Sequence, residues 1–316
     1  MTHLLGRIRY TSQASEPRLG PDGLTMDVHL TVAGAPDTVE QWTASGPVTL
    51  VPGPVVQYAH DGKTALFAAR IPWLPRYAAS VEDLYTEIFS LTAAAGYPHI
   101  FRVWQYIEGI NQPNADGLET YRDYCIGRAA AFARRGGNAY MPAATGVGAR
   151  SGGISIHLLS GRTPVVQIEN PRQLPAYRYP KQHGPKPPSF ARATWRDNEL
   201  YIAGTASIIG HRTMFPSDIV AQCKTTLSNI EALLHGGNLA RHGIDATLSL
   251  TNLNEIKVYV RREEDVPPVK RLCGSAIAEH ARISFIITGL CRADLLVEIE
   301  GVARTGQSKG SMRCSS

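Results

Sequence analysis

Two glutamates in a short apolar segment near the C-terminus have the residue types and the spacing for acid–base chemistry. In "CRADLLVEIEGVAR", Glu298 and Glu300 are separated by one residue and flanked by Leu, Val and Ile. Side chains alternate between the two faces of a β-strand, so both carboxyl groups share one face, about 7 Å apart. A buried carboxyl keeps its proton more readily, because desolvation penalises the anion. The segment predicts either a solvated strand face or a glutamate that acts as a general acid near neutral pH.

The other candidates are a cysteine, three arginines and a tyrosine. Cys291 stands just before the acidic strand, but no His–Asp pair can be placed beside it, and a lone cysteine is usually a small core residue. Arg128, Arg192 and Arg271 either form ordinary ion pairs or bind an anionic ligand. Tyr179, in a proline-rich stretch, either packs or binds a ligand. Residue types alone favour the structural role for each of them.

Two further patterns bear on cofactors and metals. "TGVGARSGG" (residues 145–153) is expected to be a glycine-rich loop. A dinucleotide fingerprint needs a strand before it and a helix after it, whereas Pro142 precedes this segment and a strand-like run follows. Its backbone N–H groups could instead line a pocket for an anion. The ten histidines show no HxH or HxxxH spacing and the five cysteines no CxxC pair, so we expect no metal site, disulfide framework or cofactor.

Composition narrows the class of protein. The chain has 316 residues, 43% of them hydrophobic, and a net charge of +5, which is typical of a globular protein of about two domains. The sequence has no basic stripe with interleaved aromatic residues, so we do not expect nucleic-acid binding. No apolar run of about 18 residues predicts a membrane span, and no signal-like segment opens the chain. A cytoplasmic protein that binds a small anionic molecule fits these properties.

The elements that must position these residues occur in two similar series. Capping residues and apolar periodicity predict helix, strand, helix and strand in each half, separated by the proline-rich segment. The first helix of each series is expected to be capped by Ser80 or Ser217, the second helix of the first half to end at Gly136, and a hairpin to turn at Asp197 and Asn198. The fold class is therefore α+β, with two units whose mixed β-sheets are each covered by helices on one face. The expected domains are an N-terminal α+β domain (1–160), a linker (161–190), a C-terminal catalytic domain (191–305) and a flexible tail (306–316).

Two family resemblances bear on these patterns. "DATLSLTNLNEIKVYV" and "DLLVEIEGVA" resemble the C-terminal half of RidA/YjgF proteins, in which such a strand presents a glutamate at an intersubunit cleft. The series "VWQYIEGIN", "YRDYCIGRAAAF", "PAATGVGARSGG" and "LYIAGTASIIGHRT" resembles the chorismatase family over nearly the whole chain. That resemblance implies two RidA/YjgF-like units, chorismate as the substrate and release of pyruvate without a cofactor.

The chorismatase resemblance also implies roles for particular residues. Glu298 would protonate the enolpyruvyl group. Gly204, in "IAGTAS", and Cys291, in "GLCRAD", match the branch that forms 3-hydroxybenzoate, with Gly204 making room for the ring and Cys291 assisting proton removal or shaping the pocket. Arg192 and Arg271, then Arg128, would hold the two carboxylates, with Tyr179 near the substrate.

Several alternatives stay open from the sequence. The enzyme could instead hydrolyse chorismate to a dihydroxycyclohexadiene carboxylate. From other classes, the protein could be a non-catalytic RidA-like module that binds a small carboxylate, or an imine deaminase. RidA-like units place their clefts between subunits, so the expected assembly is either a homotrimer or a pseudo-trimeric monomer.

Overall fold

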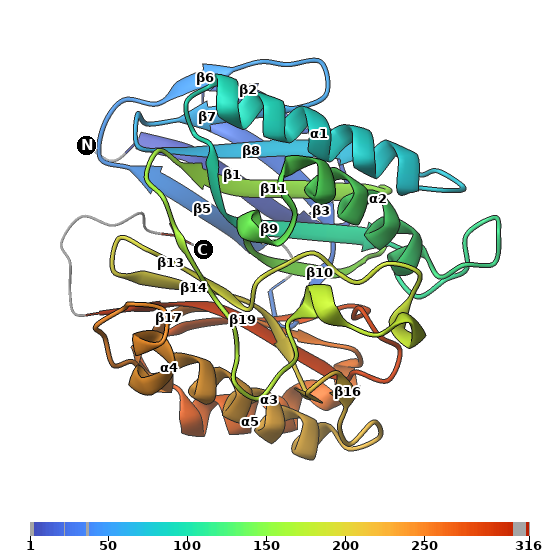
Figure 1. Cartoon of the computed structure of the whole chain (residues 1–316), viewed down its shortest axis with the longest axis vertical. Helices are drawn as coiled ribbons and strands as arrows, with labels where there is room; N and C mark the ends of the chain where they lie inside the picture. Colours follow the sequence, from blue (N-terminus) through green and yellow to red (C-terminus); the bar gives the residue numbers. More distant parts are fainter. Residues whose placement is uncertain (1–2, 22, 36–37, 306–313, 316) are drawn as a thin grey trace.

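Three large β-sheets lie between two groups of helices (Figure 1). The computed structural model describes residues 3–21, 23–35, 38–305 and 314–315. Helices α1 and α2 cover one outer side, and α3, α4 and α5 cover the opposite side. No helix in this described part of the chain is long and apolar enough to cross a membrane.

The N-terminal unit is one mixed sheet with two helices on one face. Its strand order is β10 (Ala143–Ala149), β9 (His99–Glu108), β11 (Ile154–Gly161), β8 (Thr64–Ile71), β7 (Gln57–His60), β6 (Thr49–Val51), and its helices are α1 (Ala78–Ala94), α2 (Thr120–Arg135) and the 3-10 helix η1 (Gly137–Tyr140). Helix α1 begins at Ala78, so Ser80, the expected cap, lies inside it, and the backbone N–H of Tyr77, the N-cap residue, donates to the side chain of Asp123 on α2. Gly136 ends α2 in a left-handed conformation, as predicted.

The C-terminal unit is a second mixed sheet, again covered by helices on one face. Its strand order is β12 (Val166–Ile168), β13 (Ala193–Arg196), β14 (Glu199–Ala206), β19 (Val297–Arg304), β17 (Leu253–Val260), β18 (Arg282–Ile287), β4 (Thr31–Val32). Its α-helices are α3 (Ile219–Leu234), α4 (Gly236–Ala240) and α5 (Val266–Ala276). The predicted hairpin turn is confirmed, with Asp197 and Asn198 both at positive φ. Asp218, not the expected Ser217, caps α3.

The two units share one connectivity, which confirms the α+β prediction with mixed sheets. In each, a hairpin is followed by a helix, a strand, a helix, a strand and a final strand. The final strand inserts antiparallel between the hairpin and the first crossover strand, as β11 does between β8 and β9, and β19 between β14 and β17. The two crossover strands pair in parallel, β9 with β10 and β17 with β18.

The segment between the units is irregular, as the prolines predict. Short elements interrupt it and the loops of the C-terminal unit: the 3-10 helices η2 (Ala176–Arg178), η3 (Lys181–His183), η4 (Leu250–Asn252) and η5 (Glu263–Asp265), and the two-stranded sheet β15 (Ile208–Ile209) and β16 (Arg212–Thr213). Its last turns, η2 and η3, lie near the β15–β16 hairpin through the side-chain contact of His183 with His211.

Four strands from the first 44 residues form a further sheet together with β20 (Cys314–Ser315), which the expectation of one domain over 1–160 did not anticipate, whereas β4 joins the C-terminal sheet. The strands of this further sheet, in order, are β2 (Arg18–Gly20), β3 (Gly23–His29), β1 (His3–Thr11), β5 (Thr38–Ala44) and β20. Of the tail that was expected to be flexible, residues 306–313 and 316 lie outside the described residues.

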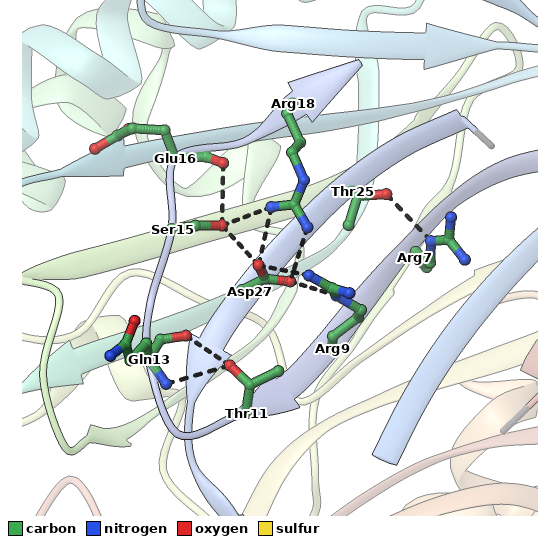
Figure 2. A network of polar contacts seen from close by, with 9 residues as sticks. All are labelled: Arg7, Arg9, Thr11, Gln13, Ser15, Glu16, Arg18, Thr25 and Asp27. Carbon is green, nitrogen blue, oxygen red and sulfur yellow. Dashed lines mark hydrogen bonds and ion pairs between the residues drawn. The ribbon is translucent and has the colours of Figure 1, made fainter. Parts of the chain in front are cut away.

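A polar cluster joins three strands of this N-terminal sheet (Figure 2). The carboxylate of Asp27 accepts hydrogen bonds from Arg9 at 2.6 and 2.8 Å, from Arg18 at 2.9 Å and from Ser15 at 2.9 Å. Burial opposes the charge, but the hydrogen bonds from the two arginines hold the pKa of Asp27 well below its usual range. The cluster therefore ties β1, β2 and β3 together.

The helix-free faces of the three sheets enclose a common apolar core. The core residues come from all three sheets. The β2-β3-β1-β5-β20 sheet contributes Leu5, Ile8 and Met26. The sheet of the N-terminal unit contributes Phe101, Trp104 and Leu159, and that of the C-terminal unit contributes Tyr201, Tyr259 and Ile286. Strand β19 lies inside the C-terminal sheet with one face toward this core. The two polar residues in the middle of that face, Glu298 and Glu300, are consequently buried between sheets.

Candidate active site

Strand β19 carries the two glutamates on its core-facing side. Val297 and Ile299 join the apolar layer beneath α3 and α5. Glu298 and Glu300 alternate with them, and each is only 3% exposed. The solvated face that the sequence left open is therefore wrong, because β14 and β17 flank β19 and the other sheets cover it.

Glu300 is held as an anion. Its carboxylate contacts Arg102 Nη2 at 2.7 Å and Lys257 Nζ at 2.9 Å, and it accepts a hydrogen bond from Trp104 Nε1 at 2.6 Å. Lys257 also pairs with Glu40 at 3.0 Å, so two cations and two anions balance in the core. Burial alone would raise the pKa of Glu300, but Arg102 and Lys257 outweigh it and lower this pKa to about 2.

Glu298 has the opposite character. Desolvation by burial raises its pKa to about 8, and the neighbouring Glu300 anion adds to the rise, while Arg102 and Arg192 oppose it. The Cys291 thiol lies 3.9 Å from Glu298 Oε2. Two carboxyls on one strand face thus have widely separated pKa values, which is the arrangement expected of an acid with an anionic neighbour. The protonated group at neutral pH is Glu298.

Gly204 gives this carboxyl its room. A Cβ atom at position 204 would lie 1.9 Å from Glu298 Oε1 and 2.8 Å from its Cδ. Strands β14 and β19 are neighbours, and the Glu298 side chain crosses directly over the glycine backbone. The absence of a side chain at Gly204 is therefore a condition for the observed position of the acid.

A cavity of about 450 Å³ lies in front of Glu298. Its walls come from both units and from the segment between them. The residues that carry charge or polarity there are Glu119, Tyr121, Arg122, Tyr179, Gln182, His183, Arg192, Arg212, Thr213, Cys291, Arg292, Asp294 and Glu298. Four arginines and three carboxyl groups line the cavity, and one of these carboxyls, Glu298, is protonated, so the excess of positive charge suits an anionic ligand.

Arg192 and Arg292 are prepared to bind such groups. Arg192 Nη2 donates to the hydroxyl of Tyr179 at 2.7 Å, and Arg292 Nη1 donates to the carbonyl oxygen of His211 at 2.9 Å. Both guanidinium groups lie over the Tyr179 ring, at 5.7 and 5.0 Å from its centroid. Arg192 Nε and Arg292 Nη2 are buried and have no hydrogen-bond partner among the described residues. These fixed, partly unsatisfied donors are what a carboxylate clamp needs.

Comparison with known proteins decides the family. A 3-hydroxybenzoate synthase from Streptomyces hygroscopicus is 43% identical over 95% of this chain and 91% of its own length. The chain belongs to the chorismatase family. A chorismatase from Streptomyces rapamycinicus is 41% identical over 95% of the chain and 92% of its length. The family model described as "Chorismatase FkbO/Hyg5-like, N-terminal" matches residues 40–160. A chorismatase crystal structure at 1.08 Å resolution superposes with a TM-score of 0.92, at 39% identity over 95% of this chain and 93% of that chain.

Five of the seven residues singled out from the sequence line the cavity of this chorismatase: Tyr179, Arg192, Gly204, Cys291 and Glu298. Arg128 does not. Its guanidinium donates to Gln105 and lies over the rings of Tyr85 and Phe132, because this side of α2 packs against α1. Arg271 is exposed on α5, which packs against Val297 and Ile299 on the face of the C-terminal sheet opposite Glu298. We therefore withdraw both arginines as substrate ligands.

Sequence reasoning missed other residues of the cavity. Arg292 adjoins Cys291, so its position beside a candidate was the one signal available. No such signal marks Tyr121 and Arg122, at the start of α2, or Arg212, in the β15–β16 hairpin. They reach the cavity only because the fold brings these two elements to its wall. The expected loop over 145–153 was also wrong in its first half: β10 extends through Ala149.

Proposed function

We propose that this chain converts chorismate into 3-hydroxybenzoate and pyruvate. The observation that carries the proposal is the buried, protonated Glu298, held over Gly204 and beside Cys291 in an arginine-lined cavity. Family membership supports the substrate, and the glycine and cysteine support the branch. Arg192 with Tyr179 and Arg292 would hold the two carboxylates of the substrate, because all three side chains line one cavity and the two guanidinium groups are held in place by hydrogen bonds.

The first step is proton transfer to carbon. Glu298 would donate its proton to the terminal methylene of the enolpyruvyl group, leaving an oxocarbenium ion on the ether carbon and a carboxylate on the enzyme. General acid catalysis contributes roughly 10²–10⁴-fold, and holding the acid at the reacting atom contributes more. The acid is available at neutral pH because its pKa is raised to about 8.

The second step is internal displacement. The ring hydroxyl of the substrate would attack the carbon that bears the ether, and the carbon–oxygen bond would break with its electrons on the departing pyruvate carbonyl. The hydroxyl proton returns to the Glu298 carboxylate. The resulting ring oxide opens and loses its ring proton to give the phenol. Because the products together contain the atoms of chorismate, no water is consumed.

Cys291 acts in this scheme as a neutral thiol. Burial raises the pKa of Cys291, and the neighbouring Glu298 raises it further, so a thiolate base is disfavoured at neutral pH. The resemblance implies two roles for Cys291, proton removal or shaping the pocket. A neutral thiol in contact with Glu298 fits the second role better. The base that accepts the proton of the substrate hydroxyl is then the Glu298 carboxylate left after the first step.

The test is incubation of the purified protein with chorismate and chromatographic identification of the products, with pyruvate followed by a coupled dehydrogenase. We expect pyruvate and 3-hydroxybenzoate in equal amounts. Glu298→Gln should lower kcat at least roughly 10²-fold, with an unchanged circular dichroism spectrum. A dihydroxycyclohexadiene carboxylate as the main product would favour the hydrolytic branch, and no pyruvate at all would favour a non-catalytic carboxylate-binding protein.

We further propose a pseudo-trimeric monomer rather than a homotrimer, acting in the cytoplasm. Three sheets of one chain already surround the central core, so no second copy is needed to close it. Light scattering coupled to size-exclusion chromatography would distinguish about 34 kDa from three times that mass.

A further inference from the structure

Thr145 lies on β10 of the N-terminal unit, behind the cavity wall. It is 1% exposed and is not among the residues that line the cavity. Its hydroxyl oxygen nevertheless accepts two hydrogen bonds from different parts of the site. Arg102 Nη2 donates at 2.7 Å, and the backbone N–H of Gly204 donates at 2.9 Å.

The second of these donors is in an irregular part of β14. The pairing of β14 with β19 shifts between Ile202 and Thr205, where three steps along β14 match two along β19. One extra residue in one strand is a β-bulge, which bends the strand and redirects its backbone groups. The bulge contains Gly204, whose N–H donates to Thr145 from the other unit.

The bulge is also the surface on which the acid rests. The Glu298 carboxyl occupies the space that a Cβ atom of Gly204 would fill, and the Thr145 methyl lies 3.2 Å from that same point. A shift of the Gly204 backbone would therefore shift the acid. The first donor, Arg102, binds the neighbouring Glu300 at 2.7 Å. Thr145 thus connects the support of the acid with the cation that holds its anionic neighbour.

We propose that Thr145 is a positioning residue for Glu298: its hydroxyl fixes the β14 bulge and Arg102 together, and so places the acid at the reacting carbon. The inference rests on the proposed role of Glu298. It gives the N-terminal unit a part in the chemistry through β10, although Thr145 is not among the residues that line the cavity.

The experiment compares Thr145→Val, which keeps the shape and loses the hydroxyl, with Thr145→Ser, which keeps it. The hydroxyl is the acceptor for Arg102 and Gly204 and also donates to the Glu300 carboxylate. Displacing a catalytic group by about 1 Å can cost 10²-fold. We expect kcat of Thr145→Val to fall about 10- to 100-fold with KM changed less than about twofold, and Thr145→Ser to keep kcat within about threefold. Thr226→Val is the matched control, because Thr226 is fully buried on α3 and its hydroxyl has no hydrogen-bond partner in the described residues.

Three results would overturn the inference while leaving the proposed function intact. These are an unchanged kcat in Thr145→Val, an equal loss in the Val and Ser variants, or an equal loss in the Thr226→Val control. If Thr145→Val does not fold, Thr145→Cys replaces it. A kcat of Thr145→Cys equal to that of Thr145→Ser would then refute the role of the hydroxyl. A wild-type protein that releases no pyruvate would instead refute the proposed function itself.

Discussion

Gly204→Ala is the perturbation whose consequence can be worked most directly from the structure. The added methyl carbon would lie 1.9 Å from Glu298 Oε1, whereas ordinary van der Waals contact begins at 3.4 Å. One of the two groups must therefore move by about 1.5 Å. The backbone is held by Thr145, so the carboxyl is the group expected to yield. Because it is packed against Cys291, it must turn toward the cavity.

The expected consequence is a slower and less selective reaction. A displacement of this size predicts a fall of about 10²-fold in kcat for 3-hydroxybenzoate formation. The displaced carboxyl also leaves the oxocarbenium ion open to water, so the share of the hydrolytic diol should rise, and more so in the double variant with Cys291→Ala. Chromatography of both products against total pyruvate measures rate and partition together.

Two controls make that result decisive. Gly274→Ala, at a position on α5 where a Cβ meets nothing within 4 Å, should leave both rate and products unchanged. If Gly204→Ala keeps the wild-type kcat and yields only 3-hydroxybenzoate, then Glu298 does not need the position it occupies, and Gly204 has no role in placing it.

Two further predictions concern charge. Glu298 must be protonated to act, so kcat/KM should fall as the pH rises through about 8. Glu300→Gln removes an anion about 7 Å away and should therefore move that fall to lower pH by about one to two units. A pH–rate profile whose alkaline limb does not move would show that Glu300 does not influence the pKa of Glu298. Arg292→Ala should raise KM about 10- to 100-fold through loss of a charged hydrogen-bond donor. Arg271→Ala, on the exposed face of α5, should leave KM unchanged. Equal KM values for the two variants in steady-state kinetics would contradict the role of Arg292 in binding a substrate carboxylate.

The sequence alone determined the local structure and the type of chemistry. Apolar periodicity and turn residues predicted the two helix–strand series, the hairpin at Asp197 and Asn198, and the end of α2 at Gly136. The family resemblance placed Gly204, Cys291 and Glu298 at one site, and all three line the cavity. These features depend on neighbouring residues or on motifs, both of which are visible in a linear sequence.

Only the tertiary structure shows why the two glutamates differ in pKa and which arginines line the cavity. Glu298 and Glu300 lie on one face of the same apolar strand, and they differ because Arg102 and Lys257, from β9 and β17, form ion pairs with Glu300. Arg128, Arg271 and Arg292 look alike in sequence, yet one packs against α1, one faces solvent and one lines the cavity. Burial and charge pairing are set by contacts between distant segments, so a residue's protonation state and its access to a ligand emerge only when the sheets close around it.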